Sequence, residues 1–159
     1  MSRAASRPSR WIAAGLFAVW GGAAGFGALA RTPADDAAAY RHYTLACMGC
    51  HGPDGEGVPN VIPPLARALG QFVQSPAGRE FIIRVPGAAN SALSDEELAL
   101  VTNMLVRRFS ADTMPASFTP YTAQEVAVHR RPALREVREQ RRKVVTGLRE
   151  IGVPAAYEY

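Results

Sequence analysis

Cys47-Met48-Gly49-Cys50-His51 is the stretch that decides the fold of this chain. Two thiols one helical turn apart can each add to one vinyl group of the same porphyrin, and the imidazole of the next residue then lies under the iron. The pattern C-x-x-C-H is accordingly the attachment signal for c-type haem. The chain has two cysteines, and both belong to this motif. The sequence therefore predicts one covalent haem c, attached through Cys47 and Cys50 and ligated by His51.

Two other interpretations of the cysteine pair have less support. A structural zinc site needs two further Cys or His ligands at suitable spacing, whereas the remaining histidines, His42 and His129, stand alone in the sequence. A thioredoxin-like redox pair needs a βαβ context, and the sequence around the motif has none. Haem attachment is the chemistry that the rest of the chain favours.

The N-terminus has the three-part form of a secretory signal peptide. Three arginines lie before residue 11, residues 11–30 carry no charge, and Ala28-Leu29-Ala30 is an A-x-A cleavage signal. An uncleaved anchor is the alternative, because the uncharged run could just span a bilayer. Its Gly and Ala content favours cleavage. We predict a signal peptide at residues 1–30 and a periplasmic protein, beginning at Arg31, with no stable membrane insertion.

Charge is distributed unevenly along the chain, whose formal net charge is +4. Residues 31–129 hold seven Arg and ten Asp or Glu, a net of −3, whereas residues 130–159 hold eight basic and four acidic residues, a net of +4. The part with the motif is thus mildly acidic and the tail basic. Because the basic run is short and export is predicted, nucleic acid is not expected as a partner.

The mature chain is long enough for one domain. We predict a haem domain at residues 31–132 and an arginine-rich C-terminal helical tail at residues 133–159. The first helix is expected from Asp35 to His51, since two acidic residues at its start suit the positive end of a helix dipole. Residues 52–64 are rich in Gly and Pro and should form a loop.

Later helices are marked by their caps. Ser75-Pro76 should start a helix that runs to Arg84 and stops at Pro86-Gly87. Ser94 to Glu97 and Thr122 to Glu125 are both capping boxes, each followed by apolar residues at helical spacing. The second box should begin a helix that ends near Arg131. A final helix is expected over residues 133–150. No segment alternates well enough to predict a strand, so the fold class is all-α.

Taken together, these segments resemble the small single-haem class I cytochromes c of bacteria. Residues 47–51 match the attachment motif, residues 52–57 the glycine-rich segment after it, and residues 62–65 the proline-leucine turn. The capped helices are similar to the later helices of the family. The resemblance covers residues 36–131. It implies helices packed around one covalently attached haem, with the tail as an extra C-terminal helix.

The resemblance also implies roles for individual residues. Cys47 and Cys50 would form the thioether bonds, and His51 would be the proximal ligand. Pro64 resembles the proline whose carbonyl accepts a hydrogen bond from the ligand imidazole, with Pro63 as the alternative. Such a bond fixes the ring orientation and raises the basicity of the ligand.

The sixth ligand of the iron is expected to be Met114. The family supplies a methionine from a loop before its last helix, and Met114-Pro115 lies between two capped helices. Met104 is the rival, although it lies inside a predicted helix, where a methionine more often fills the core. An open sixth position is the third possibility. The stretch 88–92, where many relatives carry their methionine, contains none.

A His–Met haem is closed to substrates and has a raised potential, which suits one-electron transfer. The sequence therefore predicts a periplasmic electron carrier and no enzyme. Its partners would be redox proteins, a dehydrogenase or quinol-oxidising complex on one side and an oxidase on the other. The alternatives are a dedicated cytochrome subunit of a periplasmic dehydrogenase complex, docked through the basic tail, and an open-site haem enzyme or gas sensor.

Overall fold

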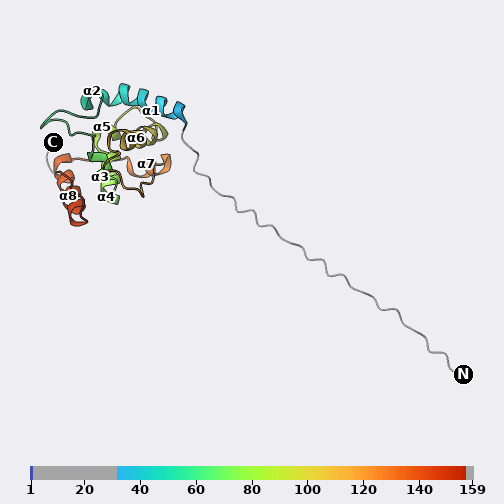
Figure 1. The fold of residues 1–159 in the computed structure, drawn as a ribbon. Helices are drawn as coiled ribbons and strands as arrows, with labels where there is room; N and C mark the ends of the chain where they lie inside the picture. Colours follow the sequence, from blue (N-terminus) through green and yellow to red (C-terminus); the bar gives the residue numbers. More distant parts are fainter. Residues whose placement is uncertain (2–31, 157–159) are drawn as a thin grey trace. The chain divides into compact units, whose positions relative to one another are not determined.

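Eight α-helices make up the regular structure of the computed structural model, which describes Met1 and residues 32–156 (Figure 1). They are α1 (Pro33–Ala46), α2 (Met48–His51), α3 (Ala68–Phe72), α4 (Pro76–Arg84), α5 (Pro86–Ala89), α6 (Asp95–Phe109), α7 (Ala123–His129) and α8 (Val137–Glu150). Among the described residues, β-type backbone pairing is limited to an isolated bridge between Val58 and Ile62. The all-α prediction is confirmed. The predicted leader, apart from Met1, lies outside the described residues.

The first helix begins and ends earlier than the sequence predicted. Thr32 is its N-cap: the Thr32 hydroxyl accepts from the Asp35 amide at 3.2 Å, and the Asp35 carboxylate accepts from the Thr32 amide at 2.8 Å. The helix begins at Pro33, so the start predicted at Asp35 is two residues late. At Cys47 the backbone leaves the helical region, with φ −132° and ψ −38°. The end predicted at His51 is also wrong, because the motif forms its own short helix, α2.

The middle of the chain contains two short helices that the sequence did not indicate. Ser75 caps α4 as predicted, accepting from the Gly78 amide at 3.0 Å. Pro86 does interrupt α4, but it also begins the one-turn helix α5. The other unpredicted helix is α3, whose five residues are too few for a helical period to be visible.

Both later caps are present, but only one is a complete capping box. Around Ser94, at the start of α6, both reciprocal hydrogen bonds form. Thr122 accepts from the Glu125 amide at 3.1 Å. The Glu125 carboxylate does not return to Thr122, because it binds the Arg79 guanidinium instead. The second predicted box is thus reduced to a single cap, and α7 ends at His129.

The last helix starts four residues later than predicted. The Leu134 amide donates to the carbonyl of Arg84 at 2.9 Å, and Glu136 has a left-handed backbone with φ 49°. Residues 133–136 therefore lie along the end of α4 and do not continue a helix. The α-helix α8 begins at Val137.

Two clusters of buried side chains hold the described residues together. The first joins α1, α3, α4, α6 and α7, with Tyr43, Ile83, Val106 and Val126 among its fully buried members. The second joins α8 to α3 and α4, and its members are Phe72, Phe81, Val145, Leu148, Val153 and Ala155. Figure 1 shows α8 beside α3 and α4. The basic tail thus packs on the body through its apolar face.

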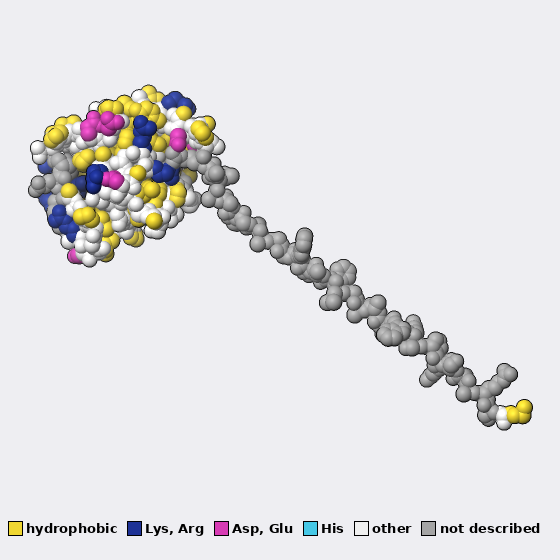
Figure 2. Space-filling model, in the orientation of Figure 1, with side chains coloured by type: hydrophobic (Ala, Val, Ile, Leu, Met, Phe, Trp, Pro, Cys, Tyr) yellow, Lys and Arg dark blue, Asp and Glu magenta, His cyan; other side chains and the backbone are white. Residues whose placement is uncertain are grey.

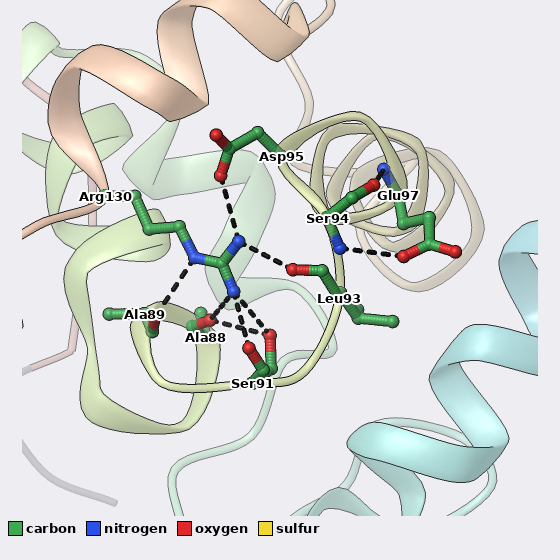
Figure 3. A network of polar contacts seen from close by, with 8 residues as sticks. All are labelled: Ala88, Ala89, Ser91, Leu93, Ser94, Asp95, Glu97 and Arg130. Atoms are coloured by element: carbon green, nitrogen blue, oxygen red, sulfur yellow. Dashed lines mark hydrogen bonds and ion pairs between the residues drawn. The ribbon is translucent and has the colours of Figure 1, made fainter.

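A single arginine holds the segment between α5 and α6 (Figure 3). Arg130, at the C-cap of α7, donates to the carbonyl of Ala89 at 3.0 Å, of Leu93 at 2.7 Å and of Ser91 at 2.7 Å. It also forms a 2.9 Å ion pair with Asp95 at the start of α6. The Arg130 side chain is only 5% exposed. The stretch 88–92, which contains no methionine, therefore consists of the end of α5 and the following loop, held around a buried guanidinium.

The surface mixes charged and apolar side chains. On the face seen in Figure 2, basic and acidic side chains lie among apolar ones. Several large apolar residues are exposed, among them Leu45, Val58, Val61, Val128 and Ile151. Among the described residues, no helix has the length and hydrophobicity needed to span a membrane.

Candidate haem site

The two cysteines lie one helical turn apart at the start and in the middle of α2. Cys47 is the N-cap of α2 and half-buried, whereas Cys50 is exposed, and neither forms a disulfide. The Cys50 and His51 amides both donate to the Cys47 carbonyl at 3.1 Å, which closes the turn. Burial, and secondarily the neighbouring Cys50, raises the pKa of the Cys47 thiol to about 11. Both sulfurs are thus available on one short helix.

His51 is held by a carbonyl from the loop that follows it. The carbonyl oxygen of Pro63 lies 3.1 Å from Nδ1 of His51. Because a carbonyl can only accept, Nδ1 carries the proton and Nε2 keeps its lone pair. Burial lowers the pKa of His51 and so favours the neutral ring, although the Pro63 hydrogen bond acts in the opposite direction. The prediction of Pro64 as the hydrogen-bond partner of His51 is wrong, and its alternative, Pro63, occupies that position.

A glycine decides which proline faces His51. Gly57 has a φ of 69°, and a Cβ built on it would lie 2.4 Å from the carbonyl oxygen of Ile62 and 2.9 Å from that of Pro63. Only glycine permits so close an approach of the two backbone segments. The Val58–Ile62 bridge follows at once, with N–O distances of 2.9 and 2.8 Å. This tight hairpin directs the Pro63 carbonyl towards the imidazole.

A buried tyrosine supports the motif and was missed by sequence reasoning. Tyr43 is 0% exposed, its hydroxyl donates to the Gly52 carbonyl at 2.5 Å, and its ring meets Phe109 edge-on at 5.5 Å. Burial is the main reason that the pKa of Tyr43 is raised to about 12. The sequence feature that could have indicated this role is the position of Tyr43, one helical turn before Cys47 in the same predicted helix. Tyr43 thus ties α1, α6 and the turn after His51 together.

Met114 and Met104 occupy different environments. Met114 lies in the turn after α6, half-buried, with its amide donating to the Ser110 carbonyl at 2.9 Å. It packs against the first core, as do Cys47 and Leu65. Met104 is 4% exposed inside α6 and borders a groove shared with Tyr40 of α1. The surroundings of Met104 are those of a residue that fills the α1–α6 interface.

We call residues 110–121 the Met114 loop, and its first part is fixed to α3. The Thr113 hydroxyl donates to the Arg67 carbonyl at 2.6 Å, and the Gln74 amide group donates to the Thr113 carbonyl at 3.1 Å. A Cβ on Gly70 would lie 2.4 Å from Thr113 Oγ1 and 2.6 Å from the Met114 nitrogen. Because α3 and this turn are in such close contact, the position of Met114 depends on a glycine at residue 70.

Gly70→Ala is expected to destabilise the holoprotein by about 1–3 kcal/mol, because the added methyl forces α3 away from the turn. Guanidinium denaturation measures this. Gly147→Ala is the matched control: it also lies within a helix, and a Cβ added there would have nothing within 4 Å of it. It should stabilise the protein by about 0.5–1 kcal/mol. Equal midpoints for the two variants would contradict the close contact at Gly70.

The other histidines do not join the motif. His42 Nε2 lies 3.6 Å from a carboxylate oxygen of Glu97, and His129 Nδ1 lies 4.0 Å from one of Glu80. Within the part of the chain that the structure describes, no group of three or more His, Cys, Asp or Glu side chains could hold a metal ion. The zinc interpretation therefore has no ligand set there.

The donors present fit a c-type haem. Two thiols lie in one helical turn, the adjacent imidazole keeps Nε2 free, and the thioether of Met114 lies in a loop that packs on the same core as Cys47. Thioether attachment needs the first pair, and His–Met ligation of iron needs the other two.

The comparisons with known proteins agree with this chemistry. No family profile matches the chain. The chain is 32% identical over 118 residues to a cytochrome c-552 of Thermus thermophilus, covering 63% of this chain and 77% of that protein. It is 34% identical over 91 residues to cytochrome c-553 of Nitratidesulfovibrio vulgaris, covering 57% and 78%. The chain therefore belongs to the bacterial single-haem cytochromes c, electron-transfer proteins that are not enzymes, and carries one covalent haem c.

Proposed function

We propose that this cytochrome is a periplasmic one-electron carrier in which Cys47 and Cys50 bind the haem, His51 is the proximal ligand and Met114 the distal one. When bound, the haem supplies reversible one-electron chemistry at iron. The observation that carries the proposal is a hydrogen bond of 3.1 Å from Nδ1 of His51 to the carbonyl of Pro63. His51 is the residue directly after Cys50. The hydrogen bond orients the imidazole and leaves Nε2 available.

The protein residues do three things for electron transfer. They would hold the haem covalently, keep His51 and Met114 in place as ligands of the iron, and exclude substrates from it. Ligands held in place in this way would keep structural rearrangement small during electron transfer. A buried first core around Tyr43 and Phe109 supports the rigidity that this requires.

We further propose that the partners are redox proteins, a dehydrogenase or quinol-oxidising complex as donor and an oxidase as acceptor. Electron-transfer contacts are small and short-lived. Exposed apolar residues beside the motif suit such contacts: Val58 is 45% and Val61 62% exposed in the loop between His51 and Pro63.

The distal ligand is tested by paired methionine variants. Met114→Ala is expected to abolish the weak near-infrared sulfur–iron band, lower the midpoint potential and allow the ferrous protein to bind carbon monoxide, because loss of the thioether opens the iron. Met104→Ala, the control, should retain the band and cost about 2–5 kcal/mol of stability through lost packing. An unchanged band in Met114→Ala, or rapid carbon monoxide binding by the wild type, would refute the assignment and favour the open-site alternative.

Export is tested separately. In a bacterial host that attaches haem c, the mature protein is expected in the periplasmic fraction with Arg31 as its first residue, because Ala28-Leu29-Ala30 fits the cleavage site. N-terminal sequencing and fractionation measure this. A chain that begins at Met1 or Ser2 and remains with the membranes would favour the uncleaved anchor.

A further inference from the structure

The second part of the Met114 loop is fixed to the body by different residues from the first part. At its end, Asn103 of α6 binds both backbone groups of Tyr121: the Asn103 amide donates to the Tyr121 carbonyl at 2.8 Å, and the Tyr121 amide donates to Asn103 at 2.7 Å. Both groups are buried, so this end is firmly held. Residues 115–120 lie between this anchor and the α3 anchor of Met114.

Packing alone does not fix residues 115–120. A surface cavity of about 450 Å³ lies beside them, bordered by Pro115 and Phe118 of the loop and by Arg79 and Glu125 of the body. Close-packed interiors resist movement because displaced atoms meet neighbours at once. Phe118 packs against the first core, but on the side of the cavity the loop meets no such resistance, so polar contacts are needed there to hold it.

Arg79 of α4 supplies those contacts. Its Nη1 donates to the Thr119 carbonyl at 2.8 Å, while Nε and Nη2 bind the two carboxylate oxygens of Glu125 at 2.9 and 2.8 Å. Its guanidinium lies 4.0 Å from the ring centre of Tyr121 and 5.9 Å from that of Phe118. The Tyr121 hydroxyl in turn donates to the Arg79 carbonyl at 3.1 Å.

Each nitrogen of the Arg79 guanidinium donates a hydrogen bond to Glu125 or to the Thr119 carbonyl. The Arg79 side chain is 18% exposed, and the two-point pairing with Glu125 fixes the plane of the fork. With the plane fixed, Nη1 is directed to the Thr119 carbonyl and the flat face of the guanidinium meets Tyr121. Because the Glu125 carboxylate pairs with Arg79, it does not accept a hydrogen bond from the Thr122 amide. The N-terminus of α7 therefore has a single cap and not a complete capping box.

A second arginine on the same helix provides a natural comparison. Arg84 forms an ion pair with Glu80 and donates to the Pro132 carbonyl at 3.2 Å. It thus makes the same kinds of contact as Arg79, with a segment that does not include the Met114 loop. A general contribution of an arginine to the stability of α4 is shared by both residues, whereas contact with the Met114 loop belongs to Arg79.

We propose that Arg79 is a positioning residue for the distal ligand: by holding residues 118–121, it keeps the Met114 loop closed and the Met114 thioether in place. This inference rests on the proposed function, in which Met114 ligates the iron. Removing Arg79 raises the population of the open loop. An external ligand that competes with Met114 then binds more tightly, in proportion to that population.

Imidazole is the probe that tests this inference on the ferric holoprotein. Arg79→Gln should raise the affinity for imidazole roughly tenfold, within the range usual for coupling between a local equilibrium and a ligand. Glu125→Gln should raise it less, since the bond to Thr119 can remain. Arg79→Lys should lie between the wild type and Arg79→Gln, because an ammonium group keeps the charge but not the fork. Arg84→Gln, the matched control, should leave the affinity at the wild-type value.

Stability is measured on the same samples by guanidinium denaturation, so that a general loss of stability is separated from loop opening. An imidazole affinity in Arg79→Gln equal to that in Arg84→Gln would overturn the inference. Should Arg79→Gln fail to fold, wild-type affinity in both Glu125→Gln and Arg79→Lys would overturn it as well.

Met114→Ala separates this inference from the proposed function. If it raises imidazole affinity while the Arg79 variants do not, Met114 is the ligand and only the role of Arg79 is wrong. If Met114→Ala leaves the affinity unchanged, the ligand assignment itself fails and the inference fails with it.

Discussion

Replacing Cys47 and Cys50 together with alanine is expected to abolish covalent haem completely. The chain has no other cysteine, so no thioether can form elsewhere. Any porphyrin that the variant retains is held only through axial ligands and packing. The wild-type haem should stay with the polypeptide after acid denaturation and organic extraction, whereas that of the double variant should pass into the organic phase.

Met48→Ala is the matched control for the cysteine variant. Met48 lies in the same turn between the two thiols and packs against the first core, but it has no part in attachment. Intact-mass spectrometry should find haem bound to Met48→Ala and to the wild type alike. Covalent haem in the double cysteine variant, or extractable haem in the wild type, would contradict attachment through Cys47 and Cys50.

Arg130→Ala is expected to lower the free energy of unfolding by about 3–5 kcal/mol, because it removes a buried guanidinium that donates to several backbone carbonyls, and each acceptor left unpaired costs about 1–3 kcal/mol. The substitution leaves the carbonyls of Ala89, Ser91 and Leu93 without their donor (Figure 3). A buried acceptor that is left without a donor costs the full desolvation penalty of that group. Asp95 contributes less, because its side chain is 41% exposed and can be solvated.

Two further variants show whether geometry or charge is responsible. Arg130→Lys should recover only a small part of the loss, because one ammonium group cannot reach acceptors on several sides of a planar guanidinium. Arg131→Ala, at the exposed next residue, should change stability by less than about 0.5 kcal/mol. Guanidinium denaturation of the holoproteins measures all three. A loss in Arg130→Ala no larger than that in Arg131→Ala would refute the role of the buried network.

The features that could be predicted from the sequence are those set by neighbouring residues. The caps at Ser75 and Ser94 involve residues three positions apart, and the attachment motif spans five. Each can be recognised without knowing where the chain goes next. Glu125 marks the limit of this logic: its local pattern predicts a bond to Thr122, but Arg79, distant in sequence, binds it more favourably.

The features that could not be predicted depend on contacts between distant segments. Pro63 faces His51 because Gly57 lets two backbone segments approach closely, and no property of the Pro63-Pro64 pair itself distinguishes the two residues. Arg130 looked like one more residue at the start of a basic tail, yet it is buried and binds a loop some 40 residues earlier. Its role is visible only once α5, α6 and α7 are packed.

The second core has a kinetic consequence for how the chain folds. Its side chains come from α3 and α4 on one side and from α8 on the other, and Gln71 bonds to the Pro154 carbonyl across 83 residues. Closing so long a loop costs entropy before any contact is made. Contacts of high sequence separation form slowly for this reason. The docking of α8 should therefore be a late event, and Phe72 and Phe81 should be the apolar groups exposed longest during folding.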